Sequence, residues 1–291
     1  LVVLGDRFDI LPAVNAALLF NLPVAHINGG EVTEGAIDDS IRHAITKMSH
    51  LHFTANQAYA RRVIQLGEEP WRVSAPGEPG LDGVKNMRHP PRADLFKELG
   101  LTEDRPVTLL THHPETIDPA GSAIAIAALL TAADDIDSQI VFTFPNADAG
   151  CQPIIDAIQG YCSRRGDCRF HASLGRERYY ALLSCADCMV GNSSSGVIEA
   201  PTFNLPVVNI GDRQKGRIMS ANVIQAPAEA KAIKAAWMKA LSQAFRQSLD
   251  GLVNPYGDGC AVERIVDVLK TTPLDRKLIV KRFNDLPGAI K

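Results

Sequence analysis

Two loops between residues 191 and 217 combine small, hydroxyl and cationic side chains in a pattern suited to binding an anion. The first loop reads GNSSSG over residues 191–196 and leads into a short helical segment that carries Glu199. Backbone N–H groups and hydroxyls at the start of a helix stabilise an anion. The second loop carries Arg213 beside two further cations. A diphosphate fits between the two loops, and a serine-capped helix next to a solvated basic turn is the alternative.

Carboxylates occupy comparable positions in the first part of the chain. Asp6 follows the first apolar run, and Glu31 follows the paired glycines of HINGGE. Asp38 and Arg42 stand four residues apart on an expected helix, so they share a face. Each is a candidate for acid–base chemistry or for binding a polar ligand. The alternatives are a helix cap, a solvated loop carboxylate and a surface ion pair.

Two adjacent histidines follow another apolar run, in the sequence THHPET at residues 111–116. The HHP spacing differs from the i, i+4 spacing of a helical zinc site. We expect His113 to contact an anion or to transfer a proton. Because successive residues of a strand face opposite sides, the ring of His112 is expected to point elsewhere.

Composition narrows the class of protein. The 291 residues suffice for two domains, and 46% hydrophobic with 22% charged residues is typical of a globular protein. A net charge of -3 without a long basic run argues against nucleic acid as a partner. The longest apolar stretch is too short for a membrane span, and no signal peptide is visible, so we expect a cytoplasmic protein. Its cysteines, including the CxxC pair Cys185 and Cys188, are expected to be reduced thiols, with no metal bound.

Apolar runs of strand length alternate with helical periodicity along the chain. In residues 37–48, for example, the apolar side chains fall on one helical face. Such alternation predicts an α/β fold with parallel sheets. The expected strands are residues 1–4, 23–27, 51–54, 71–74, 107–111, 140–144, 188–190, 206–210 and 223–225.

A Gly- and Pro-rich segment, residues 75–91, lacks periodicity and marks a domain boundary. We expect two Rossmann-like domains facing a cleft, at residues 1–85 and 92–272. The tail, residues 273–291, is expected to form a helix that packs back on the first domain. Ligands of such folds bind beyond the carboxyl ends of the strands, where the motifs above lie.

These motifs resemble those of the UDP-N-acetylglucosamine 2-epimerases, above all the hydrolysing branch that serves sialic and legionaminic acid biosynthesis. The resemblance covers nearly the whole chain, and its most specific block is GGEVTEGAIDDSIRHAITKMSH. It is also carried by GDRFDILPAVNAALLFNLPVAHIN, HHPET, GNSSSGVIEAP and NIGDRQKGR. It implies a GT-B-like fold whose first domain lacks its N-terminal segment here. The residues that it implies for holding UDP are Ser193, Ser194, Glu199 and Arg213. Those that it implies for the sugar and catalytic site are Asp6, Asp38, Arg42 and His113.

The implied reaction is the elimination of UDP from a UDP-2-acetamido sugar, followed by addition of water. It releases N-acetylmannosamine, or the equivalent from UDP-N,N'-diacetylbacillosamine. It needs neither a metal nor another cofactor. The resemblance also implies a homo-oligomer, a dimer or tetramer.

One departure from the family concerns Asn28, which stands where many members carry a carboxylate in the pattern I-E-G-G. Asparagine cannot act as a base, so that role passes to Asp6, Glu31 or Asp38. Asp38 is the best motivated, because Arg42 lies one turn away. A non-hydrolysing epimerase, a glycosyltransferase of the same fold and an inactive nucleotide-sugar-binding fragment are the alternatives.

Overall fold

The computed structural model describes residues 1–34, 37–84, 86–114, 119–146 and 150–285. The chain divides into two compact units. Unit 1 comprises Leu1–Lys85 and Pro255–Lys291, and unit 2 comprises Asn86–Asn254. Across the described ranges, no helix is both long and apolar enough to cross a membrane.

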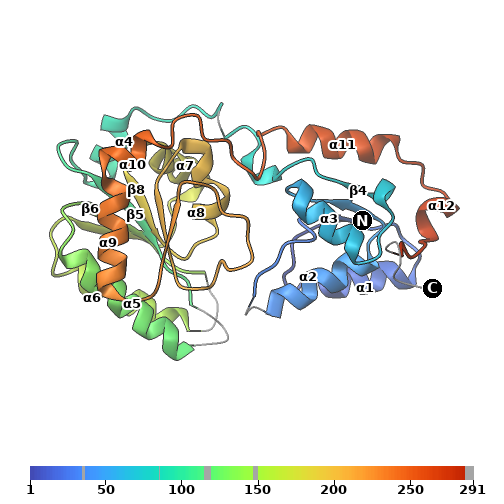
Figure 1. Ribbon diagram of the computed structural model, residues 1–291, viewed down its shortest axis with the longest axis horizontal. Helices are drawn as coiled ribbons and strands as arrows, with labels where there is room; N and C mark the ends of the chain where they lie inside the picture. The colour runs from blue at the N-terminus through green and yellow to red at the C-terminus, as the bar shows by residue number, and fades with distance from the viewer. Residues whose placement is uncertain (35–36, 85, 115–118, 147–149, 286–291) are drawn as a thin grey trace. The chain divides into compact units, whose positions relative to one another are not determined.

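Unit 1 contains a parallel four-stranded sheet in the order β1-β2-β3-β4, with helices between successive strands (Figure 1). Its strands are β1 (Val2–Leu4), β2 (Ala25–Ile27), β3 (Leu51–Phe53) and β4 (Val73–Ser74). Its connecting elements are α1 (Leu11–Leu19), α2 (Ile37–Met48), α3 (Gln57–Gln65), η1 (Pro70–Arg72) and η2 (Pro79–Leu81). The helix predicted from the apolar periodicity of residues 37–48 is therefore confirmed, with both bounds. Asn56 caps α3 by accepting a hydrogen bond from the Tyr59 N–H at 3.0 Å.

The C-terminal part of the chain belongs to unit 1, which corrects the expected domain boundary at residue 272. Residues 255–272, expected in the second domain, include the whole of helix α11 (Ala261–Thr271). The Asp82 carboxylate accepts hydrogen bonds from the first two N–H groups of α11, at 2.8 and 2.6 Å. Ile265 of α11 is buried in a cluster with Leu51 and Phe53 of β3. The helix thus follows unit 2 in sequence but packs in unit 1.

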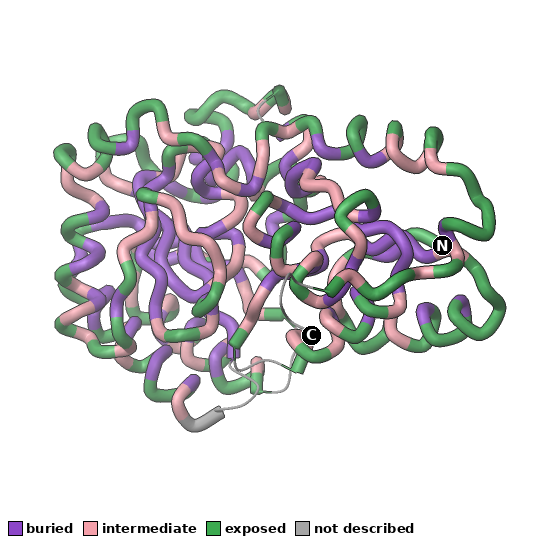
Figure 2. The backbone as a smooth tube through the Cα atoms, turned by 45° about the vertical axis from the view of Figure 1, so that its right-hand side comes forward, coloured by how far each residue is buried: buried purple, intermediate pink, exposed green. Residues whose placement is uncertain are grey.

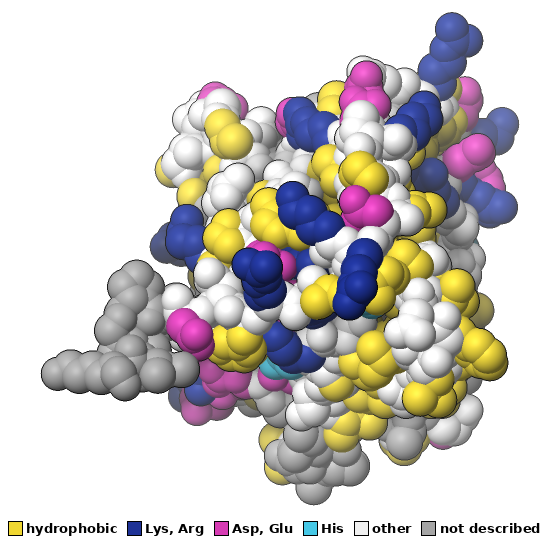
Figure 3. All heavy atoms as spheres, turned by 90° about the vertical axis from the view of Figure 1, so that its right-hand side faces the viewer, with side chains coloured by type: hydrophobic (Ala, Val, Ile, Leu, Met, Phe, Trp, Pro, Cys, Tyr) yellow, Lys and Arg dark blue, Asp and Glu magenta, His cyan; other side chains and the backbone are white. Residues whose placement is uncertain are grey.

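The tail continues this packing with a short helix, α12 (Arg276–Ile279). Buried Arg72 donates hydrogen bonds to the main-chain carbonyls of Lys277, Leu278 and Val280. Leu278 enters the same apolar cluster as Ile265. Lys and Arg side chains stand out on the face seen in Figure 3. A cavity of about 450 Å³ is lined by Arg276, Lys277 and Arg282 of the tail, together with Glu69 and Val280. The last residues of the expected tail, 286–291, lie outside the described part.

Unit 2 contains a parallel six-stranded sheet in the order β10-β9-β8-β5-β6-β7. Its strands are β5 (Val107–Thr111), β6 (Gln139–Thr143), β7 (Cys168–His171), β8 (Cys188–Gly191), β9 (Val207–Ile210) and β10 (Val223–Ala226). Its helices are α4 (Arg92–Leu99), α5 (Pro119–Asp134), α6 (Cys151–Cys162), α7 (Gly175–Cys185), α8 (Ser195–Ile198), η3 (Ala200–Phe203), α9 (Ala230–Leu241) and α10 (Gln243–Gln247). In the tube view, the strands of this unit are purple, because nearly every residue of the central strands is buried (Figure 2). The strand order reverses between β5 and β8, which makes that pair the switch point where a doubly wound sheet binds its ligand.

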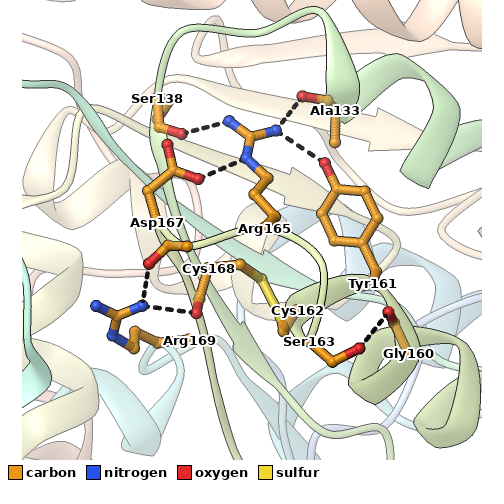
Figure 4. The surroundings of a disulfide bond; sticks show 11 residues. Ala133, Ser138, Gly160, Tyr161, Cys162, Ser163, Arg165, Asp167, Cys168 and Arg169 are labelled. Atoms are coloured by element: carbon orange, nitrogen blue, oxygen red, sulfur yellow. Dashed lines mark hydrogen bonds and ion pairs between the residues drawn. A yellow bond between two sulfur atoms is a disulfide. The ribbon is translucent and has the colours of Figure 1, made fainter.

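Strand β7 was not expected from the sequence, because Cys168–His171 is a short edge strand with a charged residue and no apolar run. A disulfide between Cys162 and Cys168 joins the end of α6 to this strand (Figure 4), so the expectation that all cysteines are reduced is wrong for this pair. In the intervening loop, Arg165 donates hydrogen bonds to the Ser138 and Ile136 carbonyls and to Asp167. These contacts fix the edge strand against its neighbours.

Candidate functional site

A cavity of about 480 Å³ opens in unit 2 at the carboxyl ends of the parallel strands, next to the β5–β8 switch point. The loops that follow β5, β6, β7 and β8 each contribute to its wall, and α7 closes one side. The polar residues that line it are Thr111, His113, Thr143, Asn146, Ser173, Arg176, Tyr179, Tyr180, Ser193, Ser194, Ser195 and Glu199. Four of the residues proposed from the sequence therefore lie in one cavity: His113, Ser193, Ser194 and Glu199.

His113 is almost fully buried, and both its main chain and its ring make hydrogen bonds with neighbouring loops. Its Nδ1 atom lies 3.1 Å from the Asn146 N–H, which assigns Nδ1 as an acceptor. Burial, followed by the positive charge of Arg213, lowers the pKa of His113 to about 3. The imidazole is therefore neutral near pH 7, with its proton on Nε2. A neutral ring of this kind donates one hydrogen bond without carrying charge.

His112 is buried as well but does not line the cavity in the described structure. Burial lowers its pKa to about 4. The two rings thus differ in their access to the cavity, as the alternation of side chains along an extended segment predicts.

The loop after β8 depends on a glycine at its start. Gly191 has φ 138, and a Cβ atom there would lie 1.8 Å from the Thr111 carbonyl oxygen. Only glycine allows the main chains of β5 and β8 to approach this closely. Asn192, the next residue, donates to the His113 carbonyl at 2.9 Å and accepts from the His113 N–H at 2.7 Å.

Glu199 lies beside the serine loop, where its carboxylate is close to Tyr179 and Ser195. Tyr179 donates a hydrogen bond to the Ser195 hydroxyl at 2.7 Å. Burial raises the pKa of the Glu199 carboxyl, while the Ser195 hydroxyl and Arg217 act in the opposite direction. Its Oε2 atom is buried and has no hydrogen-bond partner in the part of the chain that is described. An acceptor in this state suits a ligand that brings a hydroxyl group.

Arg213 lies in the loop that follows β9, and its side chain reaches the serine loop. Its Nη1 atom donates to the Asn192 carbonyl at 3.2 Å. Its side chain is half-buried, and its charge contributes to the lowered pKa values of both histidines. Arg213 is not one of the residues that line the cavity in the described structure. It lies next to the serine loop and provides positive charge there.

In unit 1, Arg42 is the centre of a polar cluster. The guanidinium is buried, and its Nη2 atom is paired with the Asp6 carboxylate and donates to the Thr33 hydroxyl at 3.0 Å. Its Nη1 atom donates to Asp39 at 3.1 Å and to the Glu31 carbonyl at 3.0 Å. The sequence predicted Arg42 and Asp6 as site residues but did not connect them, because 36 residues separate the two.

The other two carboxylates proposed from the sequence lie around this cluster. Glu31 is buried, with its main chain bound to Arg42 as described. Asp38 is half-buried in the first turn of α2, whose N-terminus favours negative charge. The structure therefore brings Asp6, Glu31 and Arg42 together and places Asp38 on the adjoining turn.

Several site residues were not proposed from the sequence. Asn192 and Tyr179 act through contacts that span long stretches of chain, and Ser195 was read only as part of its motif. Asp39, which binds the Arg42 guanidinium, was not among the proposed residues either. The only available signal for Asp39 was its i, i+3 spacing to Arg42.

In the described structure, no cysteine lines the cavity of unit 2. Cys185 and Cys188 are free thiols, and burial raises the pKa of Cys185 to about 11. Among the described residues, no group of three or more His, Cys, Asp or Glu side chains is arranged to hold a metal ion.

Comparison with known proteins gives the family. Residues 1–270 match the profile of the family described as UDP-N-acetylglucosamine 2-epimerase. The chain belongs to this family. It is 39% identical to a GDP/UDP-N,N'-diacetylbacillosamine 2-epimerase (hydrolyzing) of Campylobacter jejuni, over 98% of this chain and 74% of that protein. It is 37% identical to a UDP-N,N'-diacetylbacillosamine 2-epimerase (hydrolyzing) of Legionella pneumophila, over 96% of this chain and 72% of that protein.

Solved structures of the family agree with the architecture. The UDP-GlcNAc 2-epimerase of Neisseria meningitidis, determined bound to UDP-GlcNAc, matches with a TM-score of 0.79 at 18% identity. The match covers 93% of this chain and 76% of that one. The fold of this 2-epimerase family member is thus α/β with two Rossmann-like units, of the GT-B-like type.

Proposed function

We propose that the protein is a hydrolysing UDP-sugar 2-epimerase acting on a UDP-2-acetamido sugar. The substrate is UDP-N-acetylglucosamine or UDP-N,N'-diacetylbacillosamine, and the product is the free 2-epimer. The observation that supports this most directly is the cavity at the β5–β8 switch point, with its serine loop and Glu199. The names of the two bacterial relatives, both hydrolysing enzymes, support the release of a free sugar.

The UDP group is assigned to unit 2. The hydroxyls of Ser193 and Ser194, with the charge of Arg213, stabilise the diphosphate as it leaves. The Glu199 carboxylate accepts hydrogen bonds from the ribose hydroxyls, which satisfies its unpartnered oxygen. The neutral His113 donates from Nε2 to the diphosphate or the sugar.

The carboxylates of unit 1 carry the protons. Removal of the C2 proton leaves the electrons of that bond to form a C1–C2 double bond, while UDP departs with the electrons of the C1–O bond. Water then adds its oxygen to C1, and a proton adds to the opposite face of C2. The reaction therefore needs a proton carrier on each face of C2. Asp38 is one of them, while Asp6 and Glu31 act with Arg42 to bind and orient the sugar.

The experiment is to incubate the protein separately with the two UDP-sugars and identify the sugar released. A free 2-epimer with stoichiometric UDP supports the proposal and names the substrate. UDP-N-acetylmannosamine would show a non-hydrolysing epimerase. Transfer to an acceptor with C2 unchanged would show a glycosyltransferase, and UDP binding without turnover an inactive binding protein. We further propose a cytoplasmic dimer or tetramer, which light scattering of the purified protein tests for its oligomeric state.

A further inference from the structure

Glu78 and Asn28 are 50 residues apart in sequence but form one polar pair in unit 1. The Asn28 Nδ2 atom donates to Glu78 Oε2 at 2.7 Å. The other carboxylate oxygen accepts from the Gly80 N–H at 3.0 Å. Glu78 is 9% exposed, and these donors hold its carboxylate in one orientation. Because a carboxylate here can only accept, the Asn28 amide must direct its nitrogen to Glu78 and its oxygen away.

The pair lies at the carboxyl edge of the unit 1 sheet, where an α/β sheet binds its ligand. Asn28 directly follows β2, and Glu78 follows β4. The Ile27 carbonyl accepts from the Gly5 N–H at 3.0 Å, so the main chain at Asn28 adjoins that at Asp6. The Glu78 carboxylate therefore shares this edge with the Arg42 cluster.

Asn28 has an oxygen that remains available. Its Oδ1 atom is buried from solvent and has no hydrogen-bond partner among the described residues. Its main chain has φ 67, a left-handed conformation that asparagine tolerates better than most residues. An unpaired acceptor held in this way calls for a donor from a ligand.

Asp6, another carboxylate at this edge, is paired with the guanidinium of Arg42. Glu78 accepts a hydrogen bond from the side-chain amide of Asn28, so its carboxylate lies next to the Asn28 Oδ1 atom.

We propose that Glu78 is the base that removes the C2 proton, while Asn28 Oδ1 accepts the N–H of the 2-acetamido group. That nitrogen is bonded to C2, so an asparagine that binds it brings the C2 proton to the neighbouring carboxylate. The proton passes from C2 to Glu78 as UDP leaves, and Asp38 serves the opposite face when water adds. This inference rests on the proposed function. It explains how a chain with Asn28 in place of a carboxylate retains a base at this point.

The test compares Glu78→Gln with Glu263→Gln, which changes an exposed glutamate of α11 in the same unit. Glu78→Gln should lower UDP release by about 100-fold or more, with UDP affinity unchanged. Supplied with the 2-acetamidoglycal intermediate and UDP, this variant should still hydrate it at the wild-type rate, because that step bypasses deprotonation. Hydration also shows that the variant is folded. Glu263→Gln should behave as wild type in both assays.

The outcomes separate the inference from the function on which it rests. If the wild-type protein releases no UDP from either substrate, the proposed function is wrong. If the wild type is active and Glu78→Gln releases UDP at the same rate, or loses glycal hydration equally, Glu78 is not the base. Asn28→Gly, which suits a positive φ, should raise KM about 10-fold by removing the contact to the acetamido group. An unchanged KM would exclude that contact.

Discussion

Two hydrogen bonds join the side chain of Asn192 to the main chain of His113, one in each direction, at 2.7 and 2.9 Å. They connect the loop after β5 to the loop after β8 across the switch point of the sheet. The histidine and the serine loop are therefore positioned by the same residue. Removing the Asn192 amide is expected to disturb both sides of the cavity at once, and several changes to single side chains separate the contributions further.

Arg213→Ala should weaken UDP binding by about 1.5–3 kcal/mol, because a charge-assisted contact to the diphosphate is lost. Calorimetry with UDP measures this directly. Lys231→Ala, at an exposed cation on α9, is the matched control and should bind UDP as the wild type does. UDP affinity unchanged in Arg213→Ala would remove this residue from the site.

Glu199→Gln should weaken UDP binding by about 1.5–3 kcal/mol if the Glu199 carboxylate binds the ribose hydroxyls. The same substitution should have little effect on 2',3'-dideoxy-UDP, which lacks those hydroxyls. Measuring the affinity of the wild type and of Glu199→Gln for both nucleotides gives a double-mutant-type cycle. This cycle isolates the contact between Glu199 and the ribose hydroxyls. An equal loss for both ligands would show that Glu199 acts elsewhere.

His113→Ala should lower turnover by about 100-fold, since the ring lines the cavity and donates from Nε2. His112→Ala removes an equally buried ring that lies outside the cavity, so turnover should be close to normal once the variant is shown to be folded. Rates are measured by UDP release, and folding by circular dichroism. The opposite pattern, with only His112 essential, would reverse the assignment.

Asp38→Asn keeps size and hydrogen bonding but loses the capacity to carry a proton. Formation of the free 2-epimer should fall about 100-fold, while UDP still binds. If Asp38 serves the hydration step, UDP release should continue and the glycal should accumulate, in contrast to Glu78→Gln. Reaction in deuterium oxide, followed by analysis of C2 in product and substrate, distinguishes the steps. Turnover at the wild-type rate would make Asp38 a helix-capping residue only.

Acid should destabilise the folded protein below about pH 6.5. Burial lowers the pKa of His26, His50 and His112 to about 4, and that of His113 to about 3. These rings are neutral in the folded state between pH 4 and 6.5, whereas the unfolded chain binds protons there. Stability therefore falls as pH decreases through this window, by up to about 1.4 kcal/mol per pH unit for each histidine. Thermal unfolding from pH 8 to 5 measures it, and a constant Tm would contradict these shifts.

Much of the fold could be predicted because apolar runs bounded by Gly and Pro mark buried parallel strands. The helix Ile37–Met48 was predicted from a different signal, because its apolar face follows the 3.6-residue period. Strand β7 was missed because an edge strand with Arg169 lacks that signal. The position of α11 in unit 1 depends on Asp82 and on packing against β3, which no local pattern reveals.

The site was predictable only where a motif is contiguous. GNSSSG and Glu199 lie within nine residues of sequence, and the three serines of this motif line one cavity with Glu199 and His113. The contacts of Arg42 with Asp6, and of Asn28 with Glu78, join residues 36 and 50 positions apart. Such pairs depend on the order of strands in the sheet, which one sequence does not specify.

The packing of α11 and α12 in unit 1 has a consequence for synthesis on the ribosome. Unit 2 is continuous in sequence and has all of its strands once residue 254 has emerged. Unit 1 starts earlier, yet its apolar cluster needs Ile265 and Leu278, and its Arg72 needs the carbonyls of the tail. Domains usually fold in the order in which they are synthesised. Here the unit made first completes its folding last, so the apolar cluster around Leu51 and Phe53 forms only after the cavity of unit 2 already exists.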